Sequence, residues 1–134
     1  MLLTKASEYA LLSLIYIAQK NTPSDVDTMS GELKISKSFL AKILQNLARE
    51  GILVSFKGAN GGFMLAQKPE EISIKRIIES AEKRKMAVFE CSISADSCAS
   101  SKGGICQIWP MFSALQSKID DFLDTITLAN IIKK

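Results

Sequence analysis

Three cysteines, Cys91, Cys98 and Cys106, are the residues of this sequence best suited to chemistry, and the chain has no others. Cys91 and Cys106 flank residues 92–104, and Cys98 lies among them. These residues are almost all small or polar, so no hydrophobic core can be built from them. A loop without regular structure can wrap several thiolates round one metal centre and hydrogen-bond to sulfur through its backbone N–H groups. Metal binding is therefore the chemistry that this arrangement favours.

The spacing of the cysteines, six intervening residues and then seven, favours an iron–sulfur cluster over zinc. Structural zinc sites typically use closely spaced cysteine pairs, and three thiolates leave a tetrahedral zinc ion one ligand short. Iron–sulfur clusters tolerate wider spacing, and one non-cysteine ligand is a known variation. A redox-active thiol switch is the alternative interpretation, because a structural disulfide would leave an odd thiol and is unexpected in the cytoplasm.

Other classes of protein fit the composition poorly. The 134 residues include no histidine, which removes Ser-His-Asp and Cys-His catalysis and most acid–base schemes at neutral pH, so we expect no enzyme. An electron-transfer protein is the less favoured alternative. The glycine-rich residues 57–62 lack the ending of a phosphate loop, so no nucleotide cofactor is expected. Without a long apolar run or a signal-peptide pattern, we expect a cytoplasmic protein with no membrane partner.

Positive charge is concentrated in one segment of the chain. The net charge is only +3, but residues 34–68 carry six basic residues against a single acidic one, Glu50. Residues 86–134 carry four basic and five acidic residues. A concentrated basic segment is expected of a surface that meets phosphates, although a solvated lysine-rich face would give the same counts.

The helices and strands expected in and around this basic segment indicate a winged helix-turn-helix. Helices are expected over residues 5–19, with Thr4 as N-cap, over 26–33, and from Ser36 to the stop at Gly51. The apolar residues of the third helix are expected to face inward: Phe39, Leu40, Ile43, Leu44 and Leu47. Strands over 52–56 and 63–66 follow, joined through Asn60-Gly61, a strong hairpin signal. The fold class is mostly α, with a small β-hairpin wing.

A last helix begins at Pro110 and is predicted to form a dimer. Its apolar residues recur at alternating steps of four and three: Ile108, Phe112, Leu115, Ile119, Phe122 and Ile126. This spacing is that of a coiled-coil seam, and it favours a twofold dimer helix over packing within one chain. Before it, a helix over residues 72–81 closes the first domain. The predicted organisation is a DNA-binding domain at 1–85, a cysteine-bearing loop at 86–107 and a dimerisation helix at 108–134.

The sequence resembles the IscR/NsrR/RirA group of bacterial winged-helix regulators over essentially its whole length. The matching stretches are Leu3-Thr4, residues 8–11 (EYAL), residues 35–44 (ISKSFLAKIL), residues 55–65 (SFKGANGGFML) and the three late cysteines. The resemblance implies a homodimer that binds palindromic double-stranded operator DNA. It also implies one iron–sulfur cluster per subunit, whose state sets DNA affinity and reports nitric oxide, oxygen, or iron and cluster supply. We favour a 4Fe–4S cluster, with 2Fe–2S as the alternative, since three thiolates can hold three irons and leave the fourth for an oxygen ligand.

The chain departs from IscR at the fourth ligand. IscR has a histidine shortly after the last cysteine, where this sequence reads Gln107-Ile108-Trp109. In NsrR-like members a carboxylate near the N-terminus of the partner subunit takes this role, and the matching residue is Glu8. Glu8 shares a predicted helix face with apolar residues, where an unpartnered carboxylate would be costly, although it could simply favour the positive end of its helix. The competing ligands are Glu90 and Asp96.

The resemblance also assigns the DNA contacts. Residues expected to meet DNA lie on the third helix and on the wing: Ser36, Lys37, Ser38, Lys42, Gln45, Lys57 and Asn60. Lys37 and Lys42 suit phosphates, whereas Ser38 and Gln45 can reach base edges. The wing, with Lys57 at its base, would approach the minor groove. Ala41 stands where IscR carries a glutamate that helps to read its operator, so we expect a different half-site.

Overall fold

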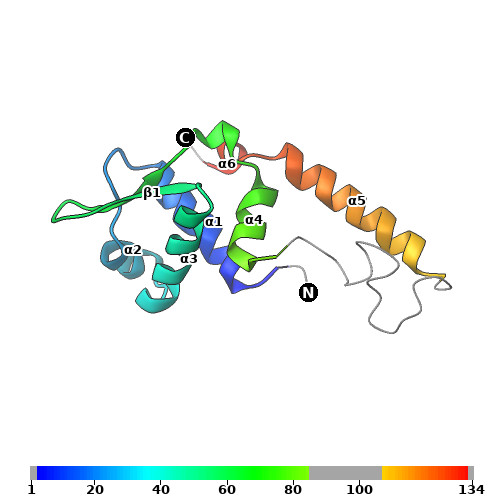
Figure 1. Ribbon diagram of the computed structural model, residues 1–134, viewed down its shortest axis with the longest axis horizontal. Helices are drawn as coiled ribbons and strands as arrows, with labels where there is room; N and C mark the ends of the chain where they lie inside the picture. The colour runs from blue at the N-terminus through cyan, green and yellow to red at the C-terminus, as the bar shows by residue number, and fades with distance from the viewer. Residues whose placement is uncertain (1–2, 85–106, 133–134) are drawn as a thin grey trace.

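The computed structural model describes residues 3–84 and 107–132 of the chain, and all structural statements concern these residues. The elements in chain order are α1 (Lys5–Ala18), α2 (Val26–Leu33), α3 (Lys37–Arg49), β1 (Leu53–Phe56), β2 (Gly62–Leu65), the 3-10 turn η1 (Pro69–Glu71), α4 (Ile74–Glu82), α5 (Trp109–Thr125) and α6 (Leu128–Ile131). The hairpin and α5 extend towards opposite ends of the molecule (Figure 1). The predicted class, mostly α with a hairpin wing, is confirmed.

Side-chain caps start the helices of the helix-turn-helix where the sequence places them. The Thr4 hydroxyl accepts a hydrogen bond from the Ala6 amide, and the Asp25 carboxylate accepts one from Thr28. Ser36 caps α3 by accepting from the Phe39 amide. Between α2 and α3 the chain turns at Lys34, which adopts a left-handed conformation with φ 58°. These local interactions satisfy amide groups that a helix leaves unpaired, and they fix where each helix begins.

The wing is a two-stranded antiparallel hairpin with a third partner from the loop before α2. The register pairs Leu53 with Leu65 and Phe56 with Gly62. Ser24 exchanges both backbone hydrogen bonds with Phe63, at 3.0 and 2.9 Å. A Cβ atom on Gly62 would lie only 2.5 Å from the Ser24 carbonyl oxygen, and its φ is 149°, so only glycine fits there. The predicted strands are confirmed to within one residue.

The core joins both ends of the described chain. Its buried apolar side chains come from α1, α2, α3, β1, α4 and α6, and include Leu14, Met29, Leu44, Ile77 and Leu128. The segment after α5 returns to the first domain: the Ile74 amide donates to the Ile126 carbonyl and the Leu128 amide to the Ile72 carbonyl, both at 2.9 Å. Leu128 is fully buried as a result.

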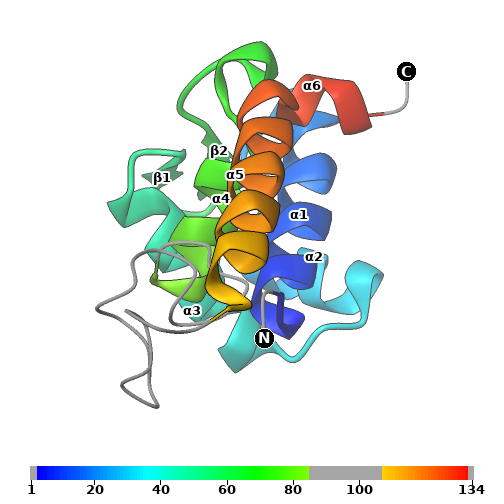
Figure 2. The ribbon, with the colours of Figure 1, turned by 90° about the vertical axis from the view of Figure 1, so that its right-hand side faces the viewer.

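Helix α5 divides its apolar residues between two surfaces. Ile119, Leu123 and Ile126 pack against the core of the same chain, and α5 lies alongside α4 (Figure 2). A second stripe is exposed to solvent, which we call the α5 stripe: Ile108, Met111, Leu115 and Phe122. The predicted seam is therefore part intrachain contact and part open surface. None of the described helices is long and apolar enough to cross a membrane.

Candidate nucleic-acid interface

Helix α3 presents the polar face that the sequence predicts for DNA recognition. Ser38, Lys42 and Gln45 are exposed on it, and Ala41 is half-buried. Ser36 is also exposed, but its hydroxyl is engaged as the helix cap, 3.3 Å from the Phe39 amide. Helix α3 therefore combines polar side chains of the kind that can reach base edges with cations suited to phosphates.

Lys37, at the start of α3, is held by a carboxylate that the sequence analysis does not identify. Its Nζ lies 2.6 Å from an Oδ1 atom of Asp27 on α2, and both side chains are largely exposed. The hydrogen bond and the charge of Asp27 raise the pKa of Lys37, so the ammonium group stays charged at neutral pH. A DNA phosphate would have to compete with Asp27 for this ammonium group.

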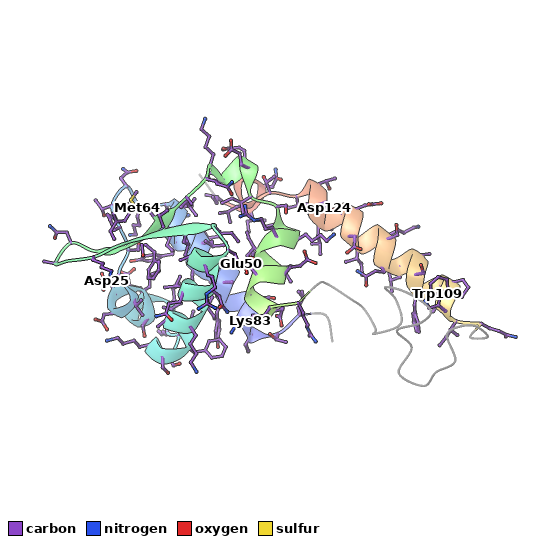
Figure 3. All side chains as sticks on the ribbon, viewed as in Figure 1. Asp25, Glu50, Met64, Lys83, Trp109 and Asp124 are labelled. Carbon is purple, nitrogen blue, oxygen red and sulfur yellow. The ribbon has the colours of Figure 1, made fainter. Side chains whose placement is uncertain are left out.

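We therefore expect Asp27→Asn to tighten DNA binding. Exposed ion pairs contribute about 0–1 kcal/mol, which sets a gain of up to roughly fivefold in affinity. Because Lys37 would be released to phosphate, the salt dependence of binding should steepen as well. Equilibrium DNA binding at several salt concentrations measures both effects. Asp124→Asn, which makes the same charge change on the side of the molecule away from α2 (Figure 3), is the control; equal effects of the two variants would contradict the prediction.

The wing carries exposed polar and apolar residues. Lys57 and Asn60 are both exposed in the loop that joins β1 to β2. The loop is tight, because a Cβ atom on Gly61 would lie 2.4 Å from the Phe56 carbonyl oxygen. Val54 and Phe56 alternate along β1 and are 42% and 49% exposed. This apolar face is not among the features predicted from the sequence, although the period-2 alternation of the strand signals it.

Additional cations from α4 and from the two residues that follow it lie beside the end of α3. A hollow of about 410 Å³ is lined by Asn46, Arg49, Glu50, Arg76, Glu79, Ser80, Lys83 and Arg84. Arg76 donates to the Glu50 carbonyl at 2.8 Å and to the side chain of Gln67. The predicted basic segment at 34–68 is thus extended by residues that lie later in the sequence and meet it only in the fold.

Glu8 lies on α1 in a different environment from the one expected. Its side chain is 52% exposed, and its Oε2 atom lies 3.0 Å from the Lys5 ammonium. The Glu8 carboxylate is therefore hydrated and paired in the single chain, and the expected burial penalty for an unpartnered carboxylate is wrong. Glu8 borders a mainly apolar hollow with Leu3, Lys5 and Leu11. Its exposure leaves the carboxylate accessible from outside the chain.

A hydrogen-bond cluster anchors the start of α1 to the end of α4. The Glu82 Oε2 atom accepts from the Thr4 amide at 3.0 Å, the Thr4 hydroxyl at 2.7 Å and the Ser7 hydroxyl at 2.5 Å. Burial alone would raise the pKa of Glu82, but these hydrogen bonds outweigh it and lower the pKa below its usual range. The cluster thus fixes the helix that carries Glu8 to the element that leads into residues 85–106.

The lowered pKa of Glu82 predicts a pH-dependent contribution to stability. A carboxyl group with a depressed native pKa stabilises the fold above its unfolded-state pKa, and this stabilisation is lost as pH falls through the native value. Glu82→Gln retains an acceptor oxygen but no charge. The substitution should lower the free energy of unfolding at pH 7. It should have no effect at a pH below the native pKa of Glu82, where the wild-type carboxyl group is already protonated. Urea titrations from pH 7 downwards measure the difference, with the exposed Glu70→Gln as control; a pH-independent difference would contradict the assignment.

The cysteines and their competing ligands lie outside the described residues. Cys91, Cys98, Cys106, Glu90 and Asp96 all fall within 85–106. Among residues 3–84 and 107–132, no group of three or more histidine, cysteine, aspartate or glutamate side chains is placed to hold a metal ion. Glu8 is the one predicted ligand that the structure describes.

Comparison with known proteins identifies the family. The model of the Rrf2 family, described as iron-dependent transcriptional regulators, matches residues 3–134. The chain belongs to the Rrf2 family. The resemblance to the IscR/NsrR group is thereby confirmed.

Individual Rrf2 relatives share sequence or fold with this chain. It is 32% identical over 136 residues to an HTH-type transcriptional regulator of Aquifex aeolicus, covering 98% of this chain and 92% of the relative. It is 34% identical over 93 residues to NsrR of Shouchella clausii, covering 68% and 62%. The oxidized form of Staphylococcus aureus CymR has the same fold, with a TM-score of 0.74, 22% identity and coverage of 100% and 98%. This Rrf2 chain is a DNA-binding transcriptional regulator.

Proposed function

We propose that this protein is a homodimeric regulator whose affinity for operator DNA is set by an iron–sulfur cluster. Cys91, Cys98 and Cys106 would hold three irons, and Glu8 of the partner subunit would supply an oxygen ligand to the fourth. The observation that carries the proposal is the donor set: three thiols in one short segment of a chain whose family is described as iron-dependent. When bound, a 4Fe–4S cluster would supply an iron that reacts with nitric oxide or oxygen.

The donor set fits such a cluster. Three cysteine thiolates satisfy the soft-ligand preference of iron–sulfur centres, and an oxygen donor at the remaining iron is chemically acceptable. Glu8 supports this role because its carboxylate is half-exposed and, among the described residues, is paired only with the exposed Lys5. An exposed ion pair of this kind is worth little, so exchanging it for an iron ligand would cost the first helix almost nothing.

The α5 stripe supports the homodimer. Its four large apolar side chains lie open to solvent: Ile108, Met111, Leu115 and Phe122 are 53%, 59%, 42% and 62% exposed. The spacing of three, four and seven residues places them along one side of the helix. A second copy related by a twofold axis would cover the same stripe with itself, and the two α3 helices would then read a palindrome.

Anaerobic purification tests the proposal directly. We expect coloured protein with iron and acid-labile sulfide, and a DNA affinity that changes when the cluster is removed. Cys98→Ser should abolish cluster binding, whereas Ser94→Ala, in the same segment, should leave the iron content unchanged. Stoichiometric zinc without iron or sulfide, from cells grown iron-replete and without oxygen, would contradict the proposal.

The same three thiols support a second candidate, a cluster-free winged-helix regulator that senses oxidants through its cysteines. A thiol sensor needs accessible cysteines rather than four ligands, so it leaves Glu8 without a role. It predicts iron-free wild-type protein whose DNA affinity responds to a mild oxidant and recovers with a thiol reductant. The iron and sulfide measurement separates the two candidates.

A further inference from the structure

Two aromatic rings join the exposed start of α1 to the first turn of α3. The centroids of the Tyr9 and Phe39 rings lie 5.5 Å apart with an interplanar angle of 86°, an edge-to-face contact. Phe39 was expected in the core, but it is 39% exposed, unlike its neighbour Leu40, which is fully buried. The contact therefore sits at the surface, beside the turn that presents Lys37 and Ser38.

Lys5 extends this contact to Glu8. The Lys5 Nζ atom lies 3.0 Å from Glu8 Oε2 and 5.8 Å from the centroid of the Tyr9 ring. An ammonium group over an aromatic face is attracted by the ring quadrupole, so the position of Lys5 and that of the ring depend on each other. Glu8, Lys5, Tyr9 and Phe39 thus form a continuous row of contacts, which we call the α1–α3 row.

The row differs from the buried packing of α1 in the core. Elsewhere α1 meets the core through fully buried aliphatic side chains such as Leu14, and close-packed interiors resist small displacements. Lys5 is largely exposed and Phe39 partly so, so both side chains have room to move. The amide of Phe39 also donates to Ser36, the cap of α3. A displacement of the Phe39 ring consequently acts on the turn that starts the recognition helix.

We propose that Tyr9 and Phe39 are positioning residues that transmit the state of Glu8 to the recognition helix. The inference rests on the proposed function, in which Glu8 exchanges Lys5 for iron. When Glu8 leaves Lys5, the ammonium group loses its carboxylate partner and changes its position over the Tyr9 ring. Tyr9 then shifts against Phe39, and the first turn of α3 moves with it. DNA affinity changes because Lys37 and Ser38 belong to that turn.

The ratio of DNA dissociation constants with and without the cluster measures this coupling. In the wild type we expect a ratio within the usual allosteric range of about 5–150-fold. Tyr9→Leu should bring the ratio to within about twofold of one, with iron content and visible spectrum unchanged. Tyr9→Phe keeps the ring and should keep the wild-type ratio. The control is Tyr16→Leu, which removes an equivalent ring under Lys20 at the far end of α1.

A second measurement needs no cluster. In cluster-free protein, Lys5→Gln should shift the backbone amide resonances of Ser38 and Phe39, and this shift should vanish in a Tyr9→Leu background. A wild-type ratio in Tyr9→Leu, or equal amide shifts in both backgrounds, would overturn the inference. Failure of the proposed function would give a different result, because the ratio of DNA dissociation constants would then be one in the wild type as well. In that case the amide shifts alone decide whether the α1–α3 row couples the two helices.

Discussion

Phe122→Glu is expected to convert the protein from a dimer to a monomer and to reduce operator affinity by more than about a hundredfold. Phe122 is the most exposed residue of the α5 stripe, at 62%, and the proposed twofold contact would bury it against the partner. A glutamate there would place an uncompensated charge in each half of the interface, at a cost of roughly 3–5 kcal/mol. A monomer would engage a single half-site.

Sedimentation equilibrium and DNA binding measured on the same samples check this result. Ser117→Glu adds the same charge to an exposed position on another side of α5, and it should leave both the dimer and its DNA affinity intact. If Phe122→Glu remains dimeric at micromolar concentration, the twofold contact lies elsewhere and the α5 stripe needs another explanation.

Leu128→Ala should lower the free energy of unfolding by about 2–5 kcal/mol, the usual cost of deleting a buried leucine side chain. Leu128 is fully buried in the core, although it follows α5 by only three residues. The loss should therefore affect the winged helix as a whole and not the C-terminal segment alone. Urea unfolding, at one protein concentration because dissociation contributes, measures it. Ile131→Ala, a partly exposed apolar residue on the same short helix, should cost far less; equal losses would refute the role given to Leu128.

Local signals made the helix-turn-helix and the wing predictable. Ser36 caps α3 through a hydrogen bond to a residue three positions away, and the hairpin forms round Asn60-Gly61 with neighbouring strands in register. Both depend on interactions within a few residues, which the order of residue types encodes directly. The burial of Leu128 depends instead on pairing residues 72–74 with 126–128, and no short-range pattern specifies that pairing.

The residues of the candidate interface could be predicted from the sequence, but most of the side chains that they contact could not. The basic character of residues 34–68 is a matter of counting, and Lys42 and Gln45 are exposed as expected. The ion pair between Lys37 and Asp27 joins two helices, and Arg76 reaches the end of α3 only through the packing of α4. The exposure of Phe39 has a similar cause, since its ring packs on Tyr9 rather than in the core.

The return of residues 126–128 to the first domain affects how the chain can fold during synthesis. Domains often fold from the N-terminus as the chain leaves the ribosome. Here the winged helix lacks part of its core until Leu128 has emerged, by which time the cysteine segment and all of α5 have also been made. A nascent chain therefore completes its DNA-binding fold only when the three cysteines and the α5 stripe have already been made. This order disfavours release of an incomplete regulator that could occupy operators without responding to a signal.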